Sequence, residues 1–399
     1  MSETRDGLCP YLSSQLLIKK RSPYNTALLE AARVELINNS GDTLIPTFTS
    51  AIYPPTTLVI LSIFSPLSWR HFRFFLLLVD TAGLVAVLAV LSLSLGSPLY
   101  SLQSLALWIM GLTWAPWHTG MATGNLAIPA ISIGIIGWWA GEQQRIWAAS
   151  VFLLASLMLK PQIGAVFVVM LVLRRCWKPV LVSLTGWGAI FIAIALWMQK
   201  QVPGWWQDYR MQVNAFFIAG HENDPSAANP LRHDLINLQR LLYTVFESRW
   251  AVSGVMLALV GLLAFGLMAK HKNKKELPSS LLTSAAVVTL ALLVFYHRFY
   301  DASLLLFAVA WAFSRWNEGA AMKYSAGAVL VGCLPFLVPG AASLAWAVNR
   351  GYFPDGMVKA WWWEVFVMSH QVWALLWILG WLSYTLAATA NKEPPTVYG

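Results

Sequence analysis

The chain has 399 residues, of which 58% are hydrophobic and only 11% are charged, and its formal net charge is +9. Because soluble proteins carry about 25% charged residues, this composition excludes a soluble domain. It predicts an all-α polytopic integral membrane protein, since helices satisfy their own backbone hydrogen bonds in lipid. The basic residues fall in short clusters between apolar runs, a pattern that sets membrane topology and does not indicate nucleic-acid binding.

The front of the chain, residues 1–52, is polar and interrupted by prolines. We interpret it as a catalytic loop on the outer membrane face. It lacks the apolar stretch of a cleavable signal peptide. Its basic residues, among them Lys19, Lys20 and Arg21, oppose the export of an unaided tail. We therefore expect a helix upstream of this chain, lost through a misassigned start or a real truncation.

Apolar runs of roughly 20 residues predict transmembrane helices, and residues 53–388 contain about 11 of them. The expected spans are residues 53–69, 72–95, 102–118, 125–140, 146–173, 178–198, 251–269, 281–296, 299–315, 325–346 and 364–388. Residues 389–399 form a cytoplasmic tail.

The orientation of these spans follows from the basic residues of the short loops, which stay cytoplasmic. If residues 146–173 crossed the membrane twice, Arg174 and Arg175 would lie outside. We therefore interpret this run as one long helix that is kinked at Pro161. With that choice Arg70 and Arg73 are cytoplasmic as well.

The outer face then receives the front loop and two further irregular segments, residues 199–250 and 347–363. Residues 234–246 have the spaced apolar side chains of an amphipathic helix at the interface. The first of the two segments also contains acidic residues and histidines without a metal-binding spacing. They are Asp208, His221, Glu222, Asp224, His233 and Asp234. We predict no cofactor and no motif-based metal site, and a divalent ion held by converging loops stays open.

Several short motifs follow one another along the chain, and each is common by itself. They are Asp6, Tyr11, Ser13-Ser14-Gln15-Leu16-Leu17, Ser22-Pro23-Tyr24, Tyr53-Pro54-Pro55, Gly124-Asn125, Leu159-Lys160-Pro161-Gln162, Arg174-Arg175-Cys176-Trp177 and Tyr296-His297-Arg298-Phe299-Tyr300-Asp301. Together their order and spacing resemble glycosyltransferase family 87, whose members are membrane enzymes of the C-type glycosyltransferase fold. The resemblance covers most of residues 6–315 and weakens beyond them.

The resemblance implies transfer of a sugar, typically mannose, from a polyprenyl-phosphate donor to a glycolipid or glycan acceptor. The reaction takes place at the outer leaflet of a bacterial-type plasma membrane. An aspartate in the first outer loop serves as general base in the family, and Asp6 is the matching position. A single displacement with one base implies inversion at the anomeric carbon. Tyr24, Tyr53, Asn125, Gln162 and Asp301 are secondary site candidates within the shared motifs.

His297, Arg298 and Asp301 form a second group at a tight outer turn between two apolar runs. Charged groups are costly at such a place unless they are paired or functional. The guanidinium fork of Arg298 suits the oxygens of a donor phosphate. His297 is suited to hydrogen-bond the phosphate or to assist proton transfer. The alternative is a helix-end cluster in which Arg298 pairs with Asp301.

Lys160 lies within an apolar run, where a lysine is a functional candidate by default. Two interpretations stay open: it contacts the donor phosphate, or it pairs with Asp80, the other charge inside an apolar run. For Asp80 itself we favour a polar contact between helices over catalysis.

The rival class is a transporter or flippase of lipid-linked sugars or small solutes. Such proteins have pseudo-symmetric halves with paired broken helices. Only one broken helix is predicted here, so a glycosyltransferase is favoured. A polymer ligase or polymerase is a third possibility, but arginines are not concentrated in residues 199–250.

Overall fold

The computed structural model describes residues 5–40, 52–216, 218–221, 223–229, 231–246, 248, 250–256, 258, 279–295 and 297–390. In this part of the chain every regular element is a helix, which confirms the all-α prediction. The chain forms two compact units. The first combines residues 1–87 and 117–224, and the second combines residues 88–116 and 225–399.

Four described helical runs are long and apolar enough to cross a membrane. They are α4 (Trp69–Ser94), α10 (Trp177–Gln201), the run Ala320–Asn349 and α19, of which residues His370–Thr389 qualify. Shorter apolar helices accompany them, and the prediction of a polytopic membrane protein is confirmed. The expected span at 251–269 lies for its larger part, residues 257 and 259–269, outside the described residues.

The first unit contains a helical hairpin where one kinked helix was expected. α8 (Ile146–Leu159) and α9 (Pro161–Leu173) are separate helices, and the chain reverses direction between them at Lys160. The direction of each follows from its contacts with α7 (Ala127–Glu142). Ser156, near the end of α8, donates to the Ala130 carbonyl near the start of α7 over 2.9 Å. α8 is therefore antiparallel to α7.

Arg174, which follows α9, pairs with Glu142 at the end of α7 over 3.0 Å. α9 is therefore parallel to α7 and antiparallel to α8. The prediction of one kinked helix over residues 146–173 is wrong, because Pro161 begins a new helix and does not bend an existing one. A proline at the first helical position loses no hydrogen bond, and it holds the preceding Lys160 in an extended conformation (φ −151°, ψ 91°).

The expected span at 53–69 is not a crossing. α3 (Pro55–Ser62) has eight residues and is about 12 Å long, against roughly 30 Å of membrane hydrocarbon. The Thr57 hydroxyl at its start donates to the Leu159 carbonyl at the end of α8 over 2.9 Å. After a short turn the chain enters α4 at Trp69.

Arg70 and Arg73 therefore begin α4 at the end of the unit where α1 (Arg5–Ile18) lies. The prediction that they lie across the membrane from Asp6 is wrong. The two errors in the span assignment cancel further along the chain. Arg174 and Arg175 remain at the opposite end from Asp6, as predicted.

The front segment, expected as a loop, contains α1 and α2 (Thr26–Ser40) in its described part. Tyr11 and Gln15 of α1 donate to the carbonyls of Leu67 (2.9 Å) and Ser65 (2.6 Å) in the turn before α4. Leucines of α1 form a buried cluster with side chains from α3, α4 and α10, namely Leu8, Leu12, Leu16, Leu17, Leu58, Leu61, Phe72, Met198 and others. α1 is thus a packed element of the first unit.

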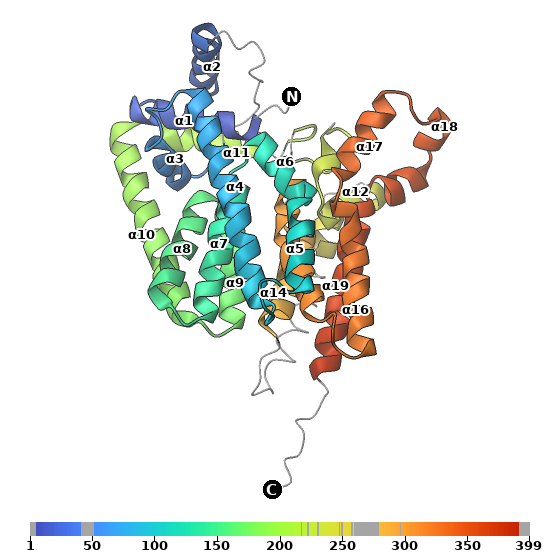
Figure 1. The fold of residues 1–399 in the computed structure, drawn as a ribbon. Coiled ribbons are helices and arrows are strands. Elements are labelled where there is room, and N and C mark those ends of the chain that lie inside the picture. Colours follow the sequence, from blue (N-terminus) through green and yellow to red (C-terminus); the bar gives the residue numbers. More distant parts are fainter. Residues whose placement is uncertain are drawn as a thin grey trace. The chain divides into compact units, whose positions relative to one another are not determined.

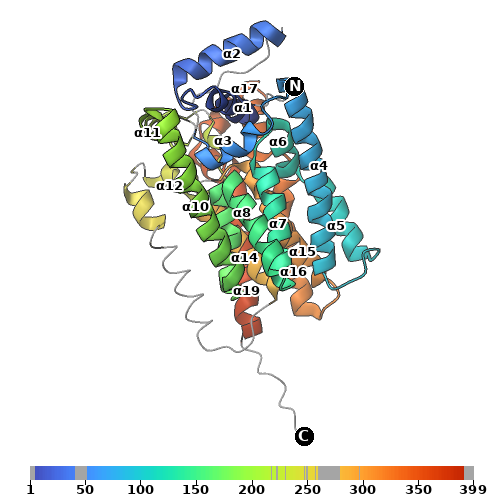
Figure 2. The same cartoon turned by 90° about the vertical axis from the view of Figure 1, so that its left-hand side faces the viewer.

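α7, α8 and α10 lie side by side in Figure 1 and Figure 2, with α1 and α3 across one end of them. α6 (Ala115–Thr123) leads into α7 at this same end. α11 (Trp205–Phe216) follows α10 there and contacts the front segment, because Gln212 donates to the Tyr24 carbonyl over 3.1 Å. We call this end, which contains Asp6, the Asp6 end.

The second unit is built around α14 (Ser280–Val294), which packs against α15 (Leu306–Ser314) and α19 (His370–Ala390). α5 (Leu102–Leu112) packs on α15, and α16 (Ala320–Cys333) packs on α15 and α19. The shorter elements are η1 (Arg232–Asp234), η2 (Phe299–Leu305), η3 (Leu334–Phe336), α17 (Gly340–Asn349), α18 (Asp355–Val358) and η4 (Trp363–Val367).

Two elements that the sequence predicts can be compared with helices of the second unit. α12 (Leu238–Phe246) confirms a helix within residues 234–246. The expected span 102–118 ends early, because α5 ends at Leu112 and α6 begins at Ala115. Thr113 caps α5 in a non-helical conformation, which separates the two helices.

Candidate functional site

Three of the predicted site residues meet at the Asp6 end of the first unit. Asn125 Nδ2 donates to Asp6 Oδ2 over 2.8 Å. Asn125 Oδ1 accepts from Lys160 Nζ over 3.2 Å. Asn125 and Lys160 are buried, with 4% and 7% of their surfaces exposed, whereas Asp6 is partly exposed. A carboxylate, an amide and an ammonium group thus form one chain of hydrogen bonds.

The backbone around Asn125 fixes the direction of its amide. Its Oδ1 also accepts from the Ala127 backbone N–H over 2.8 Å, at the first residue of α7. With two donors on the oxygen, the amide nitrogen faces Asp6, and Asp6 must accept this hydrogen bond. Asp6 Oδ1 makes no hydrogen bond with any described residue. One carboxylate oxygen is therefore held, and no described residue competes with a substrate for the other.

Asp6 owes its position to the first turn of α1, where the helix dipole favours a negative charge. Pro10, one turn later, has no N–H and cannot make the usual helical bond to the Asp6 carbonyl. The next residue, Gly7, lies against Gly124, which has a positive φ of 65°. A Cβ atom on Gly7 would lie 2.9 Å from the Gly124 carbonyl oxygen. The absence of a side chain at Gly7 thus lets Asp6 reach Asn125.

We expect Gly7→Ala to lower kcat by about tenfold or more, because the clash with backbone displaces Asp6 from its place beside Asn125. Helix propensity does not oppose the substitution, since alanine favours a helix more than glycine does. The matched control is Gly188→Ala, within α10, where an added Cβ meets nothing within 4 Å. Measured side by side, wild-type kcat in both variants would contradict this role of Gly7.

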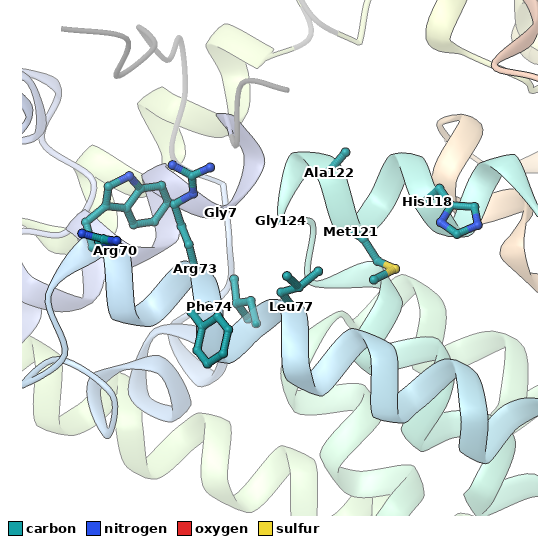
Figure 3. A pocket seen from close by; sticks show the side chains of 11 residues that line it. Gly7, Arg70, Arg73, Phe74, Leu77, His118, Met121, Ala122 and Gly124 are labelled. Atoms are coloured by element: carbon teal, nitrogen blue, oxygen red, sulfur yellow. The ribbon is translucent and has the colours of Figure 1, made fainter. Parts of the chain in front are cut away.

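A pocket of about 620 Å³ opens beside this cluster, and Gly7 and Gly124 are part of its wall. Figure 3 shows Arg70, Arg73, Phe74 and Leu77 of α4 on one side, and residues of α6 on the other. The α6 residues are His118, Met121 and Ala122. These cations were not predicted from the sequence, because Arg70 and Arg73 were expected on the cytoplasmic face. The short run between Pro55 and Ser65 was the signal that the expected first crossing is too short.

Two of the secondary candidates form structural contacts in the first unit. Tyr24 is 1% exposed, and its hydroxyl donates to the Tyr53 carbonyl over 2.9 Å. Its ring contacts Trp205 and Tyr209, and burial raises its pKa well above the usual value. This tyrosine therefore joins the front segment to α11 as an uncharged phenol. Gln162, next but one after Lys160, is exposed.

The pairing of Lys160 with Asp80 is wrong. Asp80 is 1% exposed, and its side chain makes no hydrogen bond or ion pair with any described residue. Its backbone carbonyl accepts from Trp117 Nε1 over 3.3 Å. The expected polar contact between helices is therefore made by the backbone of Asp80.

The second unit contains the other predicted group. His297 is fully buried, and its Nδ1 lies 3.1 Å from Asp301 Oδ2. The same carboxylate oxygen accepts from the Arg298 backbone N–H over 3.1 Å. His297 Nε2 has no partner among the described residues. Asp301 thus orients the imidazole, and no described residue occupies its second nitrogen. Tyr296, which precedes His297, lies outside the described residues.

A buried cluster next to this group was not predicted. Ile236 N–H donates to the His297 carbonyl over 3.2 Å, which ties residues 231–246 to it. Within that segment Arg240 is 1% exposed, and its Nη2 lies 3.5 Å from Glu364 Oε1 and 2.9 Å from His233 Nδ1. Arg232 reaches the same Glu364 oxygen over 3.2 Å. The sequence alone gives no signal for this cluster, because its members come from segments far apart in the chain.

Burial and the neighbouring charges of this cluster determine the protonation state of His233. Burial, together with Arg240 and Arg232, lowers the pKa of His233 to about 3. The imidazole is therefore neutral near pH 7, and Nδ1 accepts from Arg240. Burial also lowers the pKa of Arg240 to about 10, against the effect of Glu364. Among the described residues, no three His, Cys, Asp or Glu side chains are placed to hold a metal ion, and Glu222 lies outside them.

The fold and the cluster around Asp6 define a polytopic, all-α membrane protein with a candidate catalytic carboxylate at one end of its helices. The family model of glycosyltransferase family 87 matches residues 51–295, more than half of the chain. The chain belongs to glycosyltransferase family 87 and is a membrane glycosyltransferase. Family membership favours this class over the transporter alternative. No curated protein and no solved structure matches the chain.

The matched range separates the candidate residues. Asn125 and Lys160 lie inside it, Asp6 precedes it, and His297 and Arg298 follow it. The family assignment thus establishes the class of reaction, and the individual roles depend on the contacts described above.

Proposed function

We propose that this glycosyltransferase moves a sugar, mannose in the first instance, from a polyprenyl-phosphate donor to a glycolipid or glycan acceptor. The reaction takes place at the outer leaflet of a bacterial-type plasma membrane, and Asp6 is its general base. The observation that carries the proposal is the hydrogen-bonded chain from Asp6 through Asn125 to Lys160. It holds a carboxylate at the end of a membrane-spanning unit, next to a cationic pocket.

The reaction needs a base because the attacking acceptor hydroxyl must lose its proton as the new glycosidic bond forms. Asp6 Oδ1 takes that proton while Oδ2 stays bound to Asn125. The bond between the anomeric carbon and the donor oxygen breaks at the same time, and the polyprenyl phosphate leaves with the electron pair. A phosphate is a competent leaving group, so the step needs no strong general acid. Attack from the opposite face inverts the anomeric carbon.

The growing negative charge on the leaving phosphate needs cations in a site that excludes water. Lys160 supplies one positive charge, and its hydrogen bond to Asn125 holds this charge near Asp6. Arg298 and His297 of the second unit are the other proposed phosphate ligands. Asp301 supports this role for His297, because its carboxylate orients the ring through Nδ1 and Nε2 has no partner among the described residues.

We expect Arg298→Lys to raise the KM for the lipid-phosphate donor by about tenfold, since lysine keeps the charge and loses the planar fork. The acceptor KM stays near the wild-type value. Arg350→Lys is the matched control in the same unit, because Arg350 is exposed and stacks on Trp346. Steady-state kinetics with each substrate varied in turn measure both values. An unchanged donor KM in Arg298→Lys would remove Arg298 from the phosphate site.

A comparison of donors tests the proposed function itself. The purified protein, reconstituted in lipid nanodiscs, is incubated with membrane glycolipid acceptors and radiolabelled mannose on either polyprenyl phosphate or a nucleotide. We expect label in the acceptor from the polyprenyl-phosphate donor alone. Transfer from the nucleotide sugar, with none from the lipid donor, would contradict the proposal.

A further inference from the structure

The pocket beside Asp6 contains two arginines that no carboxylate of the described residues neutralises. Arg70 and Arg73 are exposed and lie three residues apart in α4, so they share one face of the helix. The Arg73 guanidinium lies 5.9 Å from the centre of the Trp69 ring. Neither arginine forms an ion pair with a carboxylate in the described part of the chain. Two positive charges therefore face the pocket, and no carboxylate in the described ranges compensates them.

The same pocket has an apolar side. Phe74 and Leu77 continue the helix from Arg70 and Arg73, and 59% and 46% of their surfaces are exposed. Met121 of α6 lies opposite them (Figure 3). Exposed apolar side chains on a membrane-spanning helix contact lipid tails. The pocket thus has a cationic head region that continues into a lipid-facing apolar region along α4.

This pocket lies directly next to the candidate base. Gly7 and Gly124 form part of its wall, and they are the chain neighbours of Asp6 and Asn125. A headgroup bound between Arg70 and Arg73 is therefore placed beside the carboxylate. At about 620 Å³ the pocket has the volume typical of small-ligand sites.

We propose that Arg70 and Arg73 bind the phosphate ester headgroup of a membrane-borne substrate whose tail lies along Phe74 and Leu77. Guanidinium groups bind phosphate oxygens through paired, charge-assisted hydrogen bonds. The phosphate ester belongs either to the polyprenyl-phosphate donor or to an anionic glycolipid acceptor. The identification of the ligand as a substrate rests on the proposed function, whereas the binding of the headgroup does not.

The competing explanation is that these arginines only anchor α4 to bulk lipid headgroups, as basic residues at helix ends do. The chain offers a matched control at the opposite end of the same unit. Arg145 is also exposed and also stacks on a tryptophan, with its guanidinium 5.5 Å from the Trp139 ring centre. It follows α7 at the end remote from Asp6. If the arginines only anchor the helices, substitutions at either end of the unit weaken lipid binding. If they form a specific pocket, only substitutions at the Asp6 end do so.

The test is native mass spectrometry of the full chain in neutral detergent, titrated with three lipid probes. The probes are a short-chain polyprenyl phosphate, a short-chain phosphatidylinositol and a neutral diacylglycerol. We expect the double variant R70Q/R73Q to weaken binding of at least one phosphate probe by about tenfold or more. Diacylglycerol binding stays unchanged, and R145Q binds all three probes as the wild type does. Because the substituted residues are exposed, an unchanged melting temperature serves to show that the variants fold.

Each outcome decides the proposal. Loss confined to polyprenyl phosphate assigns the pocket to the donor, and loss confined to phosphatidylinositol assigns it to an anionic acceptor. Wild-type affinity for both phosphate probes in R70Q/R73Q overturns the proposal. An equal loss in R145Q also overturns it, in favour of general anchoring.

Turnover separates this proposal from the proposed function. If the wild type binds the phosphate probes through Arg70 and Arg73 but transfers no sugar from polyprenyl phosphate, the pocket stands and the proposed function fails. If it transfers sugar and R70Q/R73Q changes neither probe binding nor the KM of either substrate, the proposed function stands and the pocket fails.

Discussion

Replacing Asp6 with asparagine is expected to lower kcat by about 10²–10⁴-fold, the range typical of a lost general base. Asparagine has nearly the same size, and its amide oxygen still accepts the hydrogen bond from Asn125 Nδ2. The substitution therefore removes the proton acceptor and keeps the geometry. Donor affinity stays near the wild-type value, because Asp6 acts on the acceptor hydroxyl. Initial rates at saturating donor and acceptor measure the loss.

Asp208→Asn is the matched control for this measurement. Asp208 also lies in the first turn of a helix of the first unit, α11, but it has no part in the cluster around Asn125. It should transfer sugar at the wild-type rate. Full activity of Asp6→Asn would show that another group, or water, takes the proton.

Asn125→Ala has the second largest expected effect, a fall of about 10²-fold in kcat, the cost of a small misplacement of a catalytic group. The substitution removes the hydrogen bonds to Asp6 and Lys160 together, so the carboxylate loses its orientation and the ammonium group loses its link to it. It also removes a side-chain bond to the Ala127 N–H at the start of α7.

Two further variants separate positioning from helix capping. Asn25 makes a comparable bond to the Leu28 N–H at the start of α2, so Asn25→Ala reports the cost of a lost cap alone. In the Asp6→Asn background, Asn125→Ala should reduce the residual rate by no more than about threefold, because coupled residues are not additive. A full 10²-fold loss in that background would mean that Asn125 acts independently of Asp6.

The sequence predicted the class of fold well, because apolar runs and basic loops depend on local composition. The prediction was wrong where the length of a helix decides whether that helix crosses the membrane. α3 lies in a run apolar enough to suggest a span, but Pro54, Pro55 and Pro66 confine its helix to eight residues. The prediction was also wrong at Pro161, because a hydrophobicity pattern does not distinguish a kink in one helix from a reversal between two helices. Only the contacts of Ser156 and Arg174 with α7 distinguish the two.

The candidate site shows the same division. Asp6, Asn125 and Lys160 were all singled out by family motifs, but no motif states that Asn125 joins the other two. That link depends on the close approach of Gly7 and Gly124, segments more than a hundred residues apart. Arg70 and Arg73 were missed because an error of one crossing moves the charges that directly follow it to the opposite face.

The front segment illustrates how tertiary packing overrides local sequence. Pro10 and the basic run after Ile18 made a loop the natural prediction, but residues Arg5–Ile18 form α1. Leu8, Leu12 and Leu17 are almost fully buried against neighbouring elements. Most helical stability in proteins comes from such packing. The helix in turn presents Asp6 in its first turn.

The most direct test of the account is the stereochemistry of the transferred sugar. The purified wild-type enzyme is given a polyprenyl-phosphate mannose of known anomeric configuration and its acceptor, and the product linkage is determined by NMR. We predict the opposite configuration at the anomeric carbon, formed by the wild type and about 10²–10⁴-fold more slowly by Asp6→Asn. Product with the donor's own configuration would require a double displacement and would contradict a single-base mechanism at Asp6.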